Sequence, residues 1–519
     1  MRTIQVRRVI TTAYCLAIIT TQTTHTMENF FPQHNTEQHT HTPAQACYNT
    51  GISEGERAYL QNRLPIAKAA LEKMLQQPLT DTQVPKIAFI CSGGGYRAML
   101  ETVGWLYGAQ KIGLLDATTY VTSLSGSTWT VAPWISTGLP LKKFKEYIQD
   151  CASKPFFDTS WQEKKLLLEA LKVKIENNQS RTLVDPYGGF LANRLLSFLG
   201  DARQQVTLSQ QAHRIENGTY PYPIYVAIDG RESIVQDQTW YEFTPHTIGD
   251  RTNNIHIPTA AYGRKFKNGV SVDNAPEKTL SHLMGTWGSA FAASIDDILE
   301  NIDNDKDQQD LLEKILEPIG GQRILPFWAE VRNYMYKMDM DEVNDEPLSY
   351  QKHLKFVDAG LDFNLPYSPV SGICSERTPE ILIFLDASKG KNTGSQLKKT
   401  AEYAAKHNRP FPVISMENIS KKTMSVFKDE NNKTTPIVIY MPGISDTALW
   451  EENKLKPEFE KYNLSEFDLY HQTNYGYCAT KNFQYAPEHS ALVMNQTEFN
   501  MRANQDAIIE EIKWCINRK

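Results

Sequence analysis

Ser125 occupies a position that fits a nucleophilic serine. The segment Tyr120–Trp129 (YVTSLSGSTW) places this residue just after a short apolar run, between small residues and before a helical pattern. A strand that turns sharply into a helix tolerates only small neighbours, and it presents the hydroxyl at the helix N-terminus, where the dipole favours a developing alkoxide. We therefore take Ser125 as a candidate nucleophile, with an ordinary serine-rich turn as the alternative.

A glycine-rich turn precedes this segment. The sequence Ser92–Arg97 (SGGGYR) follows the apolar run Lys86–Cys91, and it contains neither the P-loop pattern of nucleotide binders nor the G-x-G-x-x-G pattern of dinucleotide folds. Consecutive glycines can expose their N–H groups as a nest for a phosphate or a tetrahedral oxyanion. We expect an oxyanion hole with Gly94 and Gly95 as donors.

The base that would activate a serine is less evident. Among 12 histidines, His246, His282 and His353 are candidates by position, but each also fits a structural histidine. Asp358 is a carboxylate candidate: Leu354–Pro369 (LKFVDAGLDFNLPYSP) reads as a short strand that ends at this residue, beside an Ala-Gly turn. Such an aspartate can remove the hydroxyl proton directly in a Ser–Asp dyad. An ordinary D-A-G turn is the alternative.

The surrounding pattern predicts the elements that position these residues. Buried runs alternate with helical patterns, which favours an α/β fold with three layers: a mainly parallel central sheet and helices on both faces. A capping box of Ser53 and Glu56 opens the first helix. The expected helices are Ser53–Leu75, Gln396–His407 and Asn500–Ile516, and the expected strands after Lys86–Cys91 are Thr119–Thr122, Tyr222–Ile228, Thr239–Phe243, Leu354–Val357, Glu380–Leu385 and Pro436–Tyr440.

Three motifs together resemble a known catalytic signature. SGGGYRAM, SLSGSTW and VDAGLDFNLPY, in this order, are similar to motifs of the cytosolic phospholipase A2 catalytic domain and the fungal lysophospholipases (phospholipase B), relatives of the patatin-like acyl hydrolases. The similarity continues through FTPHTIGD, HLMGTWGSAF, NRPFPVIS, NFQYAPEHSAL and EFNMRANQD, so it covers residues 52–516. The resemblance implies a patatin-like α/β fold and an acyl hydrolase.

The resemblance also implies roles for single residues. Ser125 would attack the ester carbonyl and form an acyl-Ser intermediate, with Asp358 as its base, while Gly94 and Gly95 would hold the oxyanion. Arg97 would face the lipid phosphate, for which a guanidinium fork is suited; a structural ion pair is its alternative role. No metal or cofactor is expected. The substrates would be glycerophospholipids or lysophospholipids, and a lipid transacylase or a catalytically silent lipid-binding protein remain alternatives.

Two positions depart from the family pattern. Ser123 stands two residues before the nucleophile, where the family usually has glycine, and Tyr96 stands where a phenylalanine precedes the arginine. Both changes are conservative in size. The space before residue 52 would not hold a C2 domain, so calcium-dependent membrane targeting is not expected.

Composition limits the partners. The 519 residues are 41% hydrophobic, and 54 Lys+Arg against 60 Asp+Glu give a net charge of −6, which argues against disorder and nucleic-acid binding. A phospholipid membrane or micelle would be met by local aromatic and basic side chains. The best candidates are Lys142, Lys143, Phe144, Lys145, Tyr147, Phe156, Phe157 and Trp161. Alternatively, the helical pattern Leu166–Ile175 packs as a cap or lid.

The first residues read as a leader. Arg2, Arg7 and Arg8 precede a short apolar run in residues 1–26, which is the layout of a signal peptide and would mean export to the periplasm or medium. A start at Met27 or an organelle presequence are alternatives, and without a leader the protein would be cytoplasmic with peripheral membrane contact. We expect a linker over 27–51 and one catalytic domain over 52–519, with a cap within 141–200.

Cysteine and acidic clusters indicate no metal site. The seven cysteines show no zinc-finger spacing, although one or two disulfides are possible after export. Asp303, Asp305 and Asp307 start like a calcium loop, but Gln308 and Lys314 replace the required glycine and glutamate. This stretch and residues 339–346 are predicted to be solvated loops.

Overall fold

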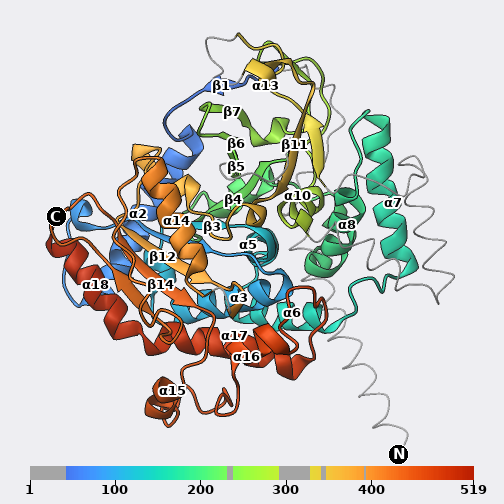
Figure 1. The fold of residues 1–519 in the computed structure, drawn as a ribbon. Helices are drawn as coiled ribbons and strands as arrows, with labels where there is room; N and C mark the ends of the chain where they lie inside the picture. The colour runs from blue at the N-terminus through green and yellow to red at the C-terminus, as the bar shows by residue number, and fades with distance from the viewer. Residues whose placement is uncertain (1–42, 231–237, 291–327, 340–345, 391–392, 519) are drawn as a thin grey trace, which may run out of the picture. The chain divides into compact units, whose positions relative to one another are not determined.

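A twelve-stranded mixed sheet lies at the centre of the described part of the protein (Figure 1). Its five central strands are parallel neighbours, and almost every side chain in them is buried, as expected of a sheet covered on both faces. In spatial order these strands are β14 (Ile437–Pro442), β12 (Ile381–Asp386), β2 (Ile87–Cys91), β3 (Tyr120–Ser123) and β4 (Tyr222–Asp229).

The computed structural model describes residues 43–230, 238–290, 328–339, 346–390 and 393–518. Residues 43–519 form a unit separate from 1–42. The predicted leader at 1–26, the calcium-loop-like stretch at 303–314 and residues 340–345 of the second acidic stretch lie outside the described residues.

Antiparallel strands extend the sheet beyond β4, so it is mixed and not mainly parallel as predicted. Successive short strands joined by tight turns must pair antiparallel, whereas parallel neighbours need a long crossover. These strands are β5 (Trp240–Phe243), β6 (Thr247–Asp250), β7 (Ile255–Pro258) and β1 (Cys47–Tyr48), with β10 (Ala329–Arg332), β11 (His353–Asp358) and β13 (Ser425–Phe427) elsewhere in the sheet. Because β1 pairs with β7, the chain joins the sheet inside the linker predicted over 27–51.

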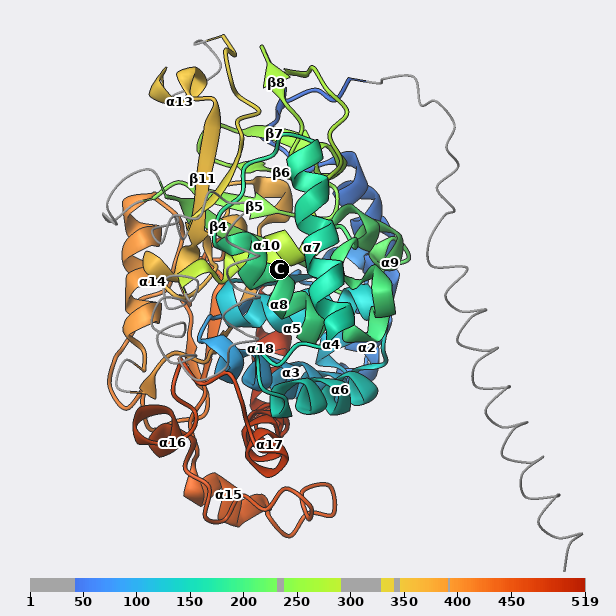
Figure 2. The same ribbon diagram turned by 90° about the vertical axis from the view of Figure 1, so that its right-hand side faces the viewer.

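Helices cover both faces of the sheet, which confirms the predicted α/β architecture. From β2 the chain passes through α3 (Gly95–Lys111) to the neighbouring strand β3. From β12 it passes through α14 (Ser395–Lys406) to the neighbouring strand β14, which lies in the opposite direction along the sheet. Right-handed crossovers that run in opposite directions place their helices on opposite faces. Figure 2 shows α14 on one side and α2 (Glu54–Leu75) on the other. The direction of winding therefore changes between β2 and β12.

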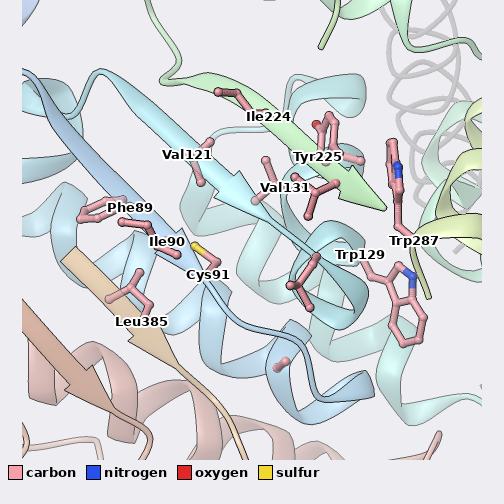
Figure 3. Packing of buried hydrophobic residues seen from close by; sticks show 14 of the residues in the cluster. Phe89, Ile90, Cys91, Val121, Trp129, Val131, Ile224, Tyr225, Trp287 and Leu385 are labelled. Carbon is pink, nitrogen blue, oxygen red and sulfur yellow. The ribbon is translucent and has the colours of Figure 1, made fainter. Parts of the chain in front are cut away.

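The core next to the nucleophile segment combines aliphatic strands with aromatic helices. Figure 3 shows Phe89, Val121 and Ile224 on the neighbouring strands β2, β3 and β4. Trp129 of α5 (Thr128–Thr137) and Trp287 of α10 (Leu280–Trp287) are fully buried beside them. Close packing of this kind leaves little freedom for the loops that leave these strands.

Two predicted helices differ from expectation in detail. The pattern at 500–516 forms the end of α17 (Pro487–Ala503) and α18 (Gln505–Asn517), which meet at Asn504. The Ser53 hydroxyl accepts the Glu56 N–H at 3.1 Å, so half of the predicted capping box is present. The Glu56 carboxylate instead accepts two hydrogen bonds from Arg377, at 2.8 and 2.6 Å. A buried ion pair thus takes the place of the second capping bond.

Three helices occupy the predicted cap region and turn most of its aromatic residues inward. These are α6 (Leu141–Ser153), α7 (Trp161–Glu176) and α8 (Val184–Leu195), and α7 lies along α8, which packs on α10 (Figures 1 and 2). Phe144 and Phe156 are buried, and Lys145 is bonded to Glu498 at 2.6 Å. The prediction that Phe144, Lys145 and Phe156 face a membrane is therefore wrong, whereas Lys142 and Lys143 are exposed. Phe144 belongs to the packed face of the amphipathic helix α6, and Phe156 packs from the turn that follows this helix.

Among the aromatic residues that the sequence suggested for a membrane surface, Trp161 is the exception, because it is 78% exposed. The Leu166–Ile175 helix packs as predicted, with Leu167 and Leu171 buried.

No helix of the described residues is long and apolar enough to cross a membrane. No disulfide joins any of the six cysteines in the described part of the chain. The remaining short elements are α4 (Leu114–Ala117), α9 (Ala212–Ile215), β8 (Phe266–Lys267), β9 (Val270–Ser271), α13 (Glu346–Tyr350), α15 (Thr447–Asn453) and α16 (Leu469–Tyr475).

Candidate active site

The nucleophile segment and the aspartate segment meet because two strands approach each other head-on along β4. Residues of β4 up to Tyr225 pair with β3, and residues from Ala227 onward pair with β11. Since β5 occupies the other edge of β4 over 225–228, β3 and β11 share one edge. β3 is parallel to β4 and β11 is antiparallel, so the end of β3 faces the end of β11. Ser125 follows the first strand, and Asp358 is the last residue of the second.

Ser125 adopts the backbone conformation of a sharp strand-to-helix turn. Its φ is 48°, a left-handed value that is uncommon for a residue with a side chain. A Cβ on the next residue, Gly126, would lie 2.1 Å from the carbonyl oxygen of Gly95, so only glycine fits there. The side chain of Ser125 is only 3% exposed. The small residues in the motif are thus required by the close approach of the glycine-rich turn.

Asp358 is a buried carboxyl group beside this serine. Its Oδ1 accepts the Gly360 N–H at 2.9 Å, and its own N–H donates to Ser289 Oγ at 2.9 Å. Burial raises the pKa of Asp358 to about 7, against the opposing effect of hydrogen bonds from the Gly360 N–H, the Ser125 hydroxyl and the Ala290 N–H. The carboxyl group therefore contacts the serine hydroxyl and titrates near neutral pH, as a general base should.

The glycine-rich turn lies directly against the serine. A Cβ on Gly93 would come within 2.7 Å of the Ser125 Cβ. Gly94 and Gly95 have φ values of 143° and 63°, which favour glycine, and Gly95 begins α3. The first N–H groups of a helix have no partner within the helix. The N–H groups of Gly94 and Gly95 thus belong to a turn that packs against Ser125 at the N-terminus of α3.

A comparison with known protein families shows which family the chain belongs to. The lysophospholipase catalytic domain family matches residues 87–448, which include all three motifs. The chain belongs to this family.

Similar proteins agree with this assignment. Mouse cytosolic phospholipase A2 epsilon is 27% identical over 539 residues, covering 90% of this chain and 60% of the relative. Human cytosolic phospholipase A2 gamma is 25% identical, covering 76% of this chain and 85% of that protein. The chain thus spans about 60% of the length of relatives such as the epsilon and zeta forms. These findings confirm the resemblance to cytosolic phospholipase A2.

Solved structures share the fold. Human GIVD cytosolic phospholipase A2 superimposes with a TM-score of 0.75 at 19% identity, covering 91% of this chain and 68% of that one. The same human protein in complex with methyl γ-linolenyl fluorophosphonate gives a TM-score of 0.67 at 20% identity. The α/β fold of this family member is therefore the fold of the cytosolic phospholipase A2 catalytic domain.

Arg97 is placed under the glycine-rich turn and not at an open surface. Its side chain is buried, and its Nε donates to the Ala387 carbonyl at 2.9 Å. Its Nη1 donates to the Cys478 carbonyl at 2.9 Å and to Thr480 Oγ1 at 3.1 Å. Glu101, one helical turn further along α3, lies 3.6 Å from Nε. These contacts match the structural role that the sequence left open, because protein groups already use Nε and Nη1.

The three candidate histidines are engaged elsewhere. His246 Nδ1 lies 2.9 Å from the Tyr222 hydroxyl, and His353 lies 3.6 Å from Glu330. His282 lies 2.8 Å from Asp185, and burial lowers its pKa to about 3. Within the described residues, none of these hydrogen bonds or ion pairs reaches Ser125. They fit the structural histidines that the sequence allowed.

Sequence reasoning missed two supporting residues. Ser289, just after α10, holds the Asp358 backbone and belongs to the quoted HLMGTWGSAF segment, where it was given no role. Asn364 contacts the glycine-rich turn through Gly93, with Nδ2 and Oδ1 both engaged. Asn364 does belong to the quoted FNLPY part of the third motif, but its partner lies 271 positions away in the sequence. Only the fold brings the two together.

Proposed function

We propose that this protein hydrolyses fatty acyl esters of glycerophospholipids or lysophospholipids through a Ser125–Asp358 dyad. The Asp358 carboxylate removes the hydroxyl proton as Ser125 attacks the ester carbonyl. The N–H groups of Gly94 and Gly95 stabilise the oxyanion of the tetrahedral intermediate. Collapse of this intermediate breaks the ester bond, Asp358 returns the proton to the departing alcohol, and an acyl-Ser remains.

The second half of the reaction repeats these steps with water. Asp358 takes a proton from a water molecule, the resulting hydroxide attacks the acyl-Ser carbonyl, and the same N–H groups stabilise the second oxyanion. Collapse of this intermediate releases the fatty acid from Ser125, and Asp358 returns the proton to the serine oxygen. The two-stage course predicts ping-pong kinetics.

One observation carries the proposal. A serine with φ of 48° stands beside a carboxyl group of pKa about 7 and beside a helix that begins with glycine. A nucleophile, a base near the working pH and two oxyanion donors are what ester hydrolysis requires. The substrate class rests on membership of the lysophospholipase catalytic domain family and on relatives named phospholipase A2.

Removal of the hydroxyl tests the function. We expect Ser125→Ala to release no fatty acid from lysophosphatidylcholine micelles or phosphatidylcholine vesicles, measured by mass spectrometry, with a loss on the order of 10⁴-fold or more in kcat. Ser123→Ala is the matched control, since this buried serine lies two residues away in β3 and should leave turnover close to that of the wild type. Fatty acid release by Ser125→Ala at the wild-type rate would refute the proposal.

A further inference from the structure

The loop after Asp358 is hydrogen-bonded to the glycine-rich turn through one side chain, that of Asn364. Asn364 Oδ1 accepts the Gly93 N–H at 3.1 Å, and Asn364 Nδ2 donates to the Gly93 carbonyl at 3.0 Å. A side-chain amide that pairs with both polar groups of one residue imitates a strand neighbour. The two bonds fix the orientation of Gly93 more firmly than either would alone.

Asn364 is itself held from two further sides. Its Nδ2 also donates to Ser388 Oγ at 2.8 Å, and its backbone N–H donates to Gln396 Oε1 at 2.8 Å. Ser388 follows β12 and Gln396 belongs to α14, while Gly93 follows β2. Asn364 therefore spans the point between β2 and β12 where the winding of the sheet changes direction. Ligands bind at such points in α/β folds because the loops on either side diverge.

The pairing determines where the next N–H points. The Gly93 carbonyl and the Gly94 N–H belong to one planar trans peptide, in which they point in opposite directions. With the carbonyl held against Asn364, the Gly94 N–H must point to the side away from Asn364. Glycine residues impose little restraint of their own, so a peptide between two of them can rotate unless other groups hold it.

We propose that Asn364 is the positioning residue of the oxyanion hole. It acts through Gly93, whose carbonyl it holds so that the Gly94 donor keeps its direction. The same side chain links this donor to the base. A Cβ on Gly360 would lie 3.2 Å from both Asn364 Oδ1 and Asp358 Oδ1, so the two side chains are neighbours on one loop. The donor and the base are thus positioned together, and this inference rests on the proposed ester hydrolysis.

Asn364→Asp tests the proposal with little change in size. The variant keeps an oxygen for the Gly93 N–H but replaces the donor with a carboxylate oxygen that repels the Gly93 carbonyl. We expect kcat to fall between about tenfold and the 10²–10³-fold typical of losing an oxyanion donor, with KM changed less than about threefold. Affinity for a fatty acyl trifluoromethyl ketone, which forms an oxyanion with the serine, should fall by the same factor. Affinity for an unreactive ether analogue of the substrate should not.

A structural control separates positioning from folding. Asn333 is buried, whereas Asn364 is half-buried, and the Asn333 amide likewise donates to two groups, the Leu348 and Gln351 carbonyls at 2.7 and 2.8 Å, near the end of β11 opposite Asp358. Asn333→Asp should lower the melting temperature without the selective loss of kcat and of ketone affinity. If Asn364→Asp folds poorly, Asn364→Ala removes the same donor without adding charge, and the same pattern is expected.

The outcomes distinguish this inference from the proposed function. Unchanged kcat and ketone affinity in the folded Asn364 variants, with wild-type hydrolysis intact and Ser125→Ala inactive, would overturn the role of Asn364 alone. An equal loss of affinity for the ketone and the ether analogue would also overturn it, since positioning of the oxyanion donor affects only the former. A wild-type protein without hydrolysis would instead remove the function itself.

Discussion

Asp358 keeps a high pKa because its burial outweighs the hydrogen bonds that favour its charged form. A carboxyl group that accepts several N–H bonds usually ionises at low pH, whereas desolvation has the opposite effect. The environment of Asp358 therefore stabilises a protonated state that an exposed aspartate would lose near pH 4. This sets both the working pH of the base and its effect on stability.

The pH dependence of turnover follows from this pKa. Only the ionised carboxylate can take the serine proton, so we expect kcat/KM to rise with pH through about 7 and then to level. Measurement of initial rates between pH 5 and 9 checks this. A rate that is already constant at pH 5 would contradict a base of this pKa.

The stability effect has the opposite sign. Between pH 3.8, the ordinary pKa of an aspartate, and about pH 7, the folded protein keeps a proton on Asp358 that the unfolded chain releases. The contribution of Asp358 to the free energy of unfolding therefore falls as pH rises across this window. It is largest below the unfolded pKa and constant above the folded one.

Arg97 is a buried motif residue whose guanidinium donates to two backbone carbonyls. Arg97→Lys keeps the positive charge but loses the fork that serves the Ala387 and Cys478 carbonyls. We expect a loss of about 1–3 kcal/mol in the free energy of unfolding for each carbonyl left without a donor. Chemical denaturation measures this loss.

Substrate comparison separates the two roles of Arg97. If the guanidinium supports the glycine-rich turn, Arg97→Lys lowers hydrolysis of a lysophospholipid and of a monoacylglycerol by the same factor. A loss confined to the phosphate-bearing substrate would instead support direct contact with the headgroup.

At the scale of elements, the sequence predicted strands well and their pairing poorly. The run that ends at Cys91 was recognisable by its unbroken apolar pattern, whereas the strands that end at Ser123 and Asp358 contain polar residues and were recognised with the help of the small-residue turns that follow them. The sequence did not predict that the ends of β3 and β11 face each other, because this depends on which edge of β4 each strand pairs with. The three motifs identified the candidate site, but the support from Ser289 and Asn364 required long-range contacts.

The cap helices illustrate the same limit. Alternating basic and aromatic residues fit a membrane surface as well as an amphipathic packed helix, and periodicity alone does not show which neighbour the aromatic face meets. Phe156 lies with its ring 5.1 Å from that of Phe483 and 5.9 Å from that of Tyr187. This aromatic cluster joins the segment after α6 to α8.

Substitution of one inward and one outward aromatic residue tests this packing. Phe156→Ala should cost about 3–5 kcal/mol of unfolding free energy because it leaves a cavity among the rings. Trp161→Ser, at a site 78% exposed, should change it by less than about 0.5 kcal/mol. Denaturant titration of both variants is sufficient, and similar costs for both would show that the cap does not pack as described.

At the scale of the whole molecule, buried ion pairs connect distant parts of the chain. Arg377 joins Glu56 of the first described helix to Glu242 of β5, and Arg251 also pairs with Glu242 at 2.8 Å. The net charge of −6 gives no sign of these internal pairs, because the two charges of an ion pair cancel in the sum. Composition therefore argued against nucleic acid as a partner but could not show how much charge the fold uses internally.

The proposed nucleophile, base and oxyanion donors come from three separate loops, and the proposal predicts that covalent chemistry occurs at one residue, Ser125. We expect a fluorescent alkyl fluorophosphonate to add once per protein molecule, on the peptide that contains Ser125, with loss of fatty acid release in proportion to labelling. Peptide mass spectrometry measures both the number and the position of the adduct. Labelling at another residue, or full hydrolysis after complete labelling of Ser125, would contradict the assignment of Ser125 as the nucleophile.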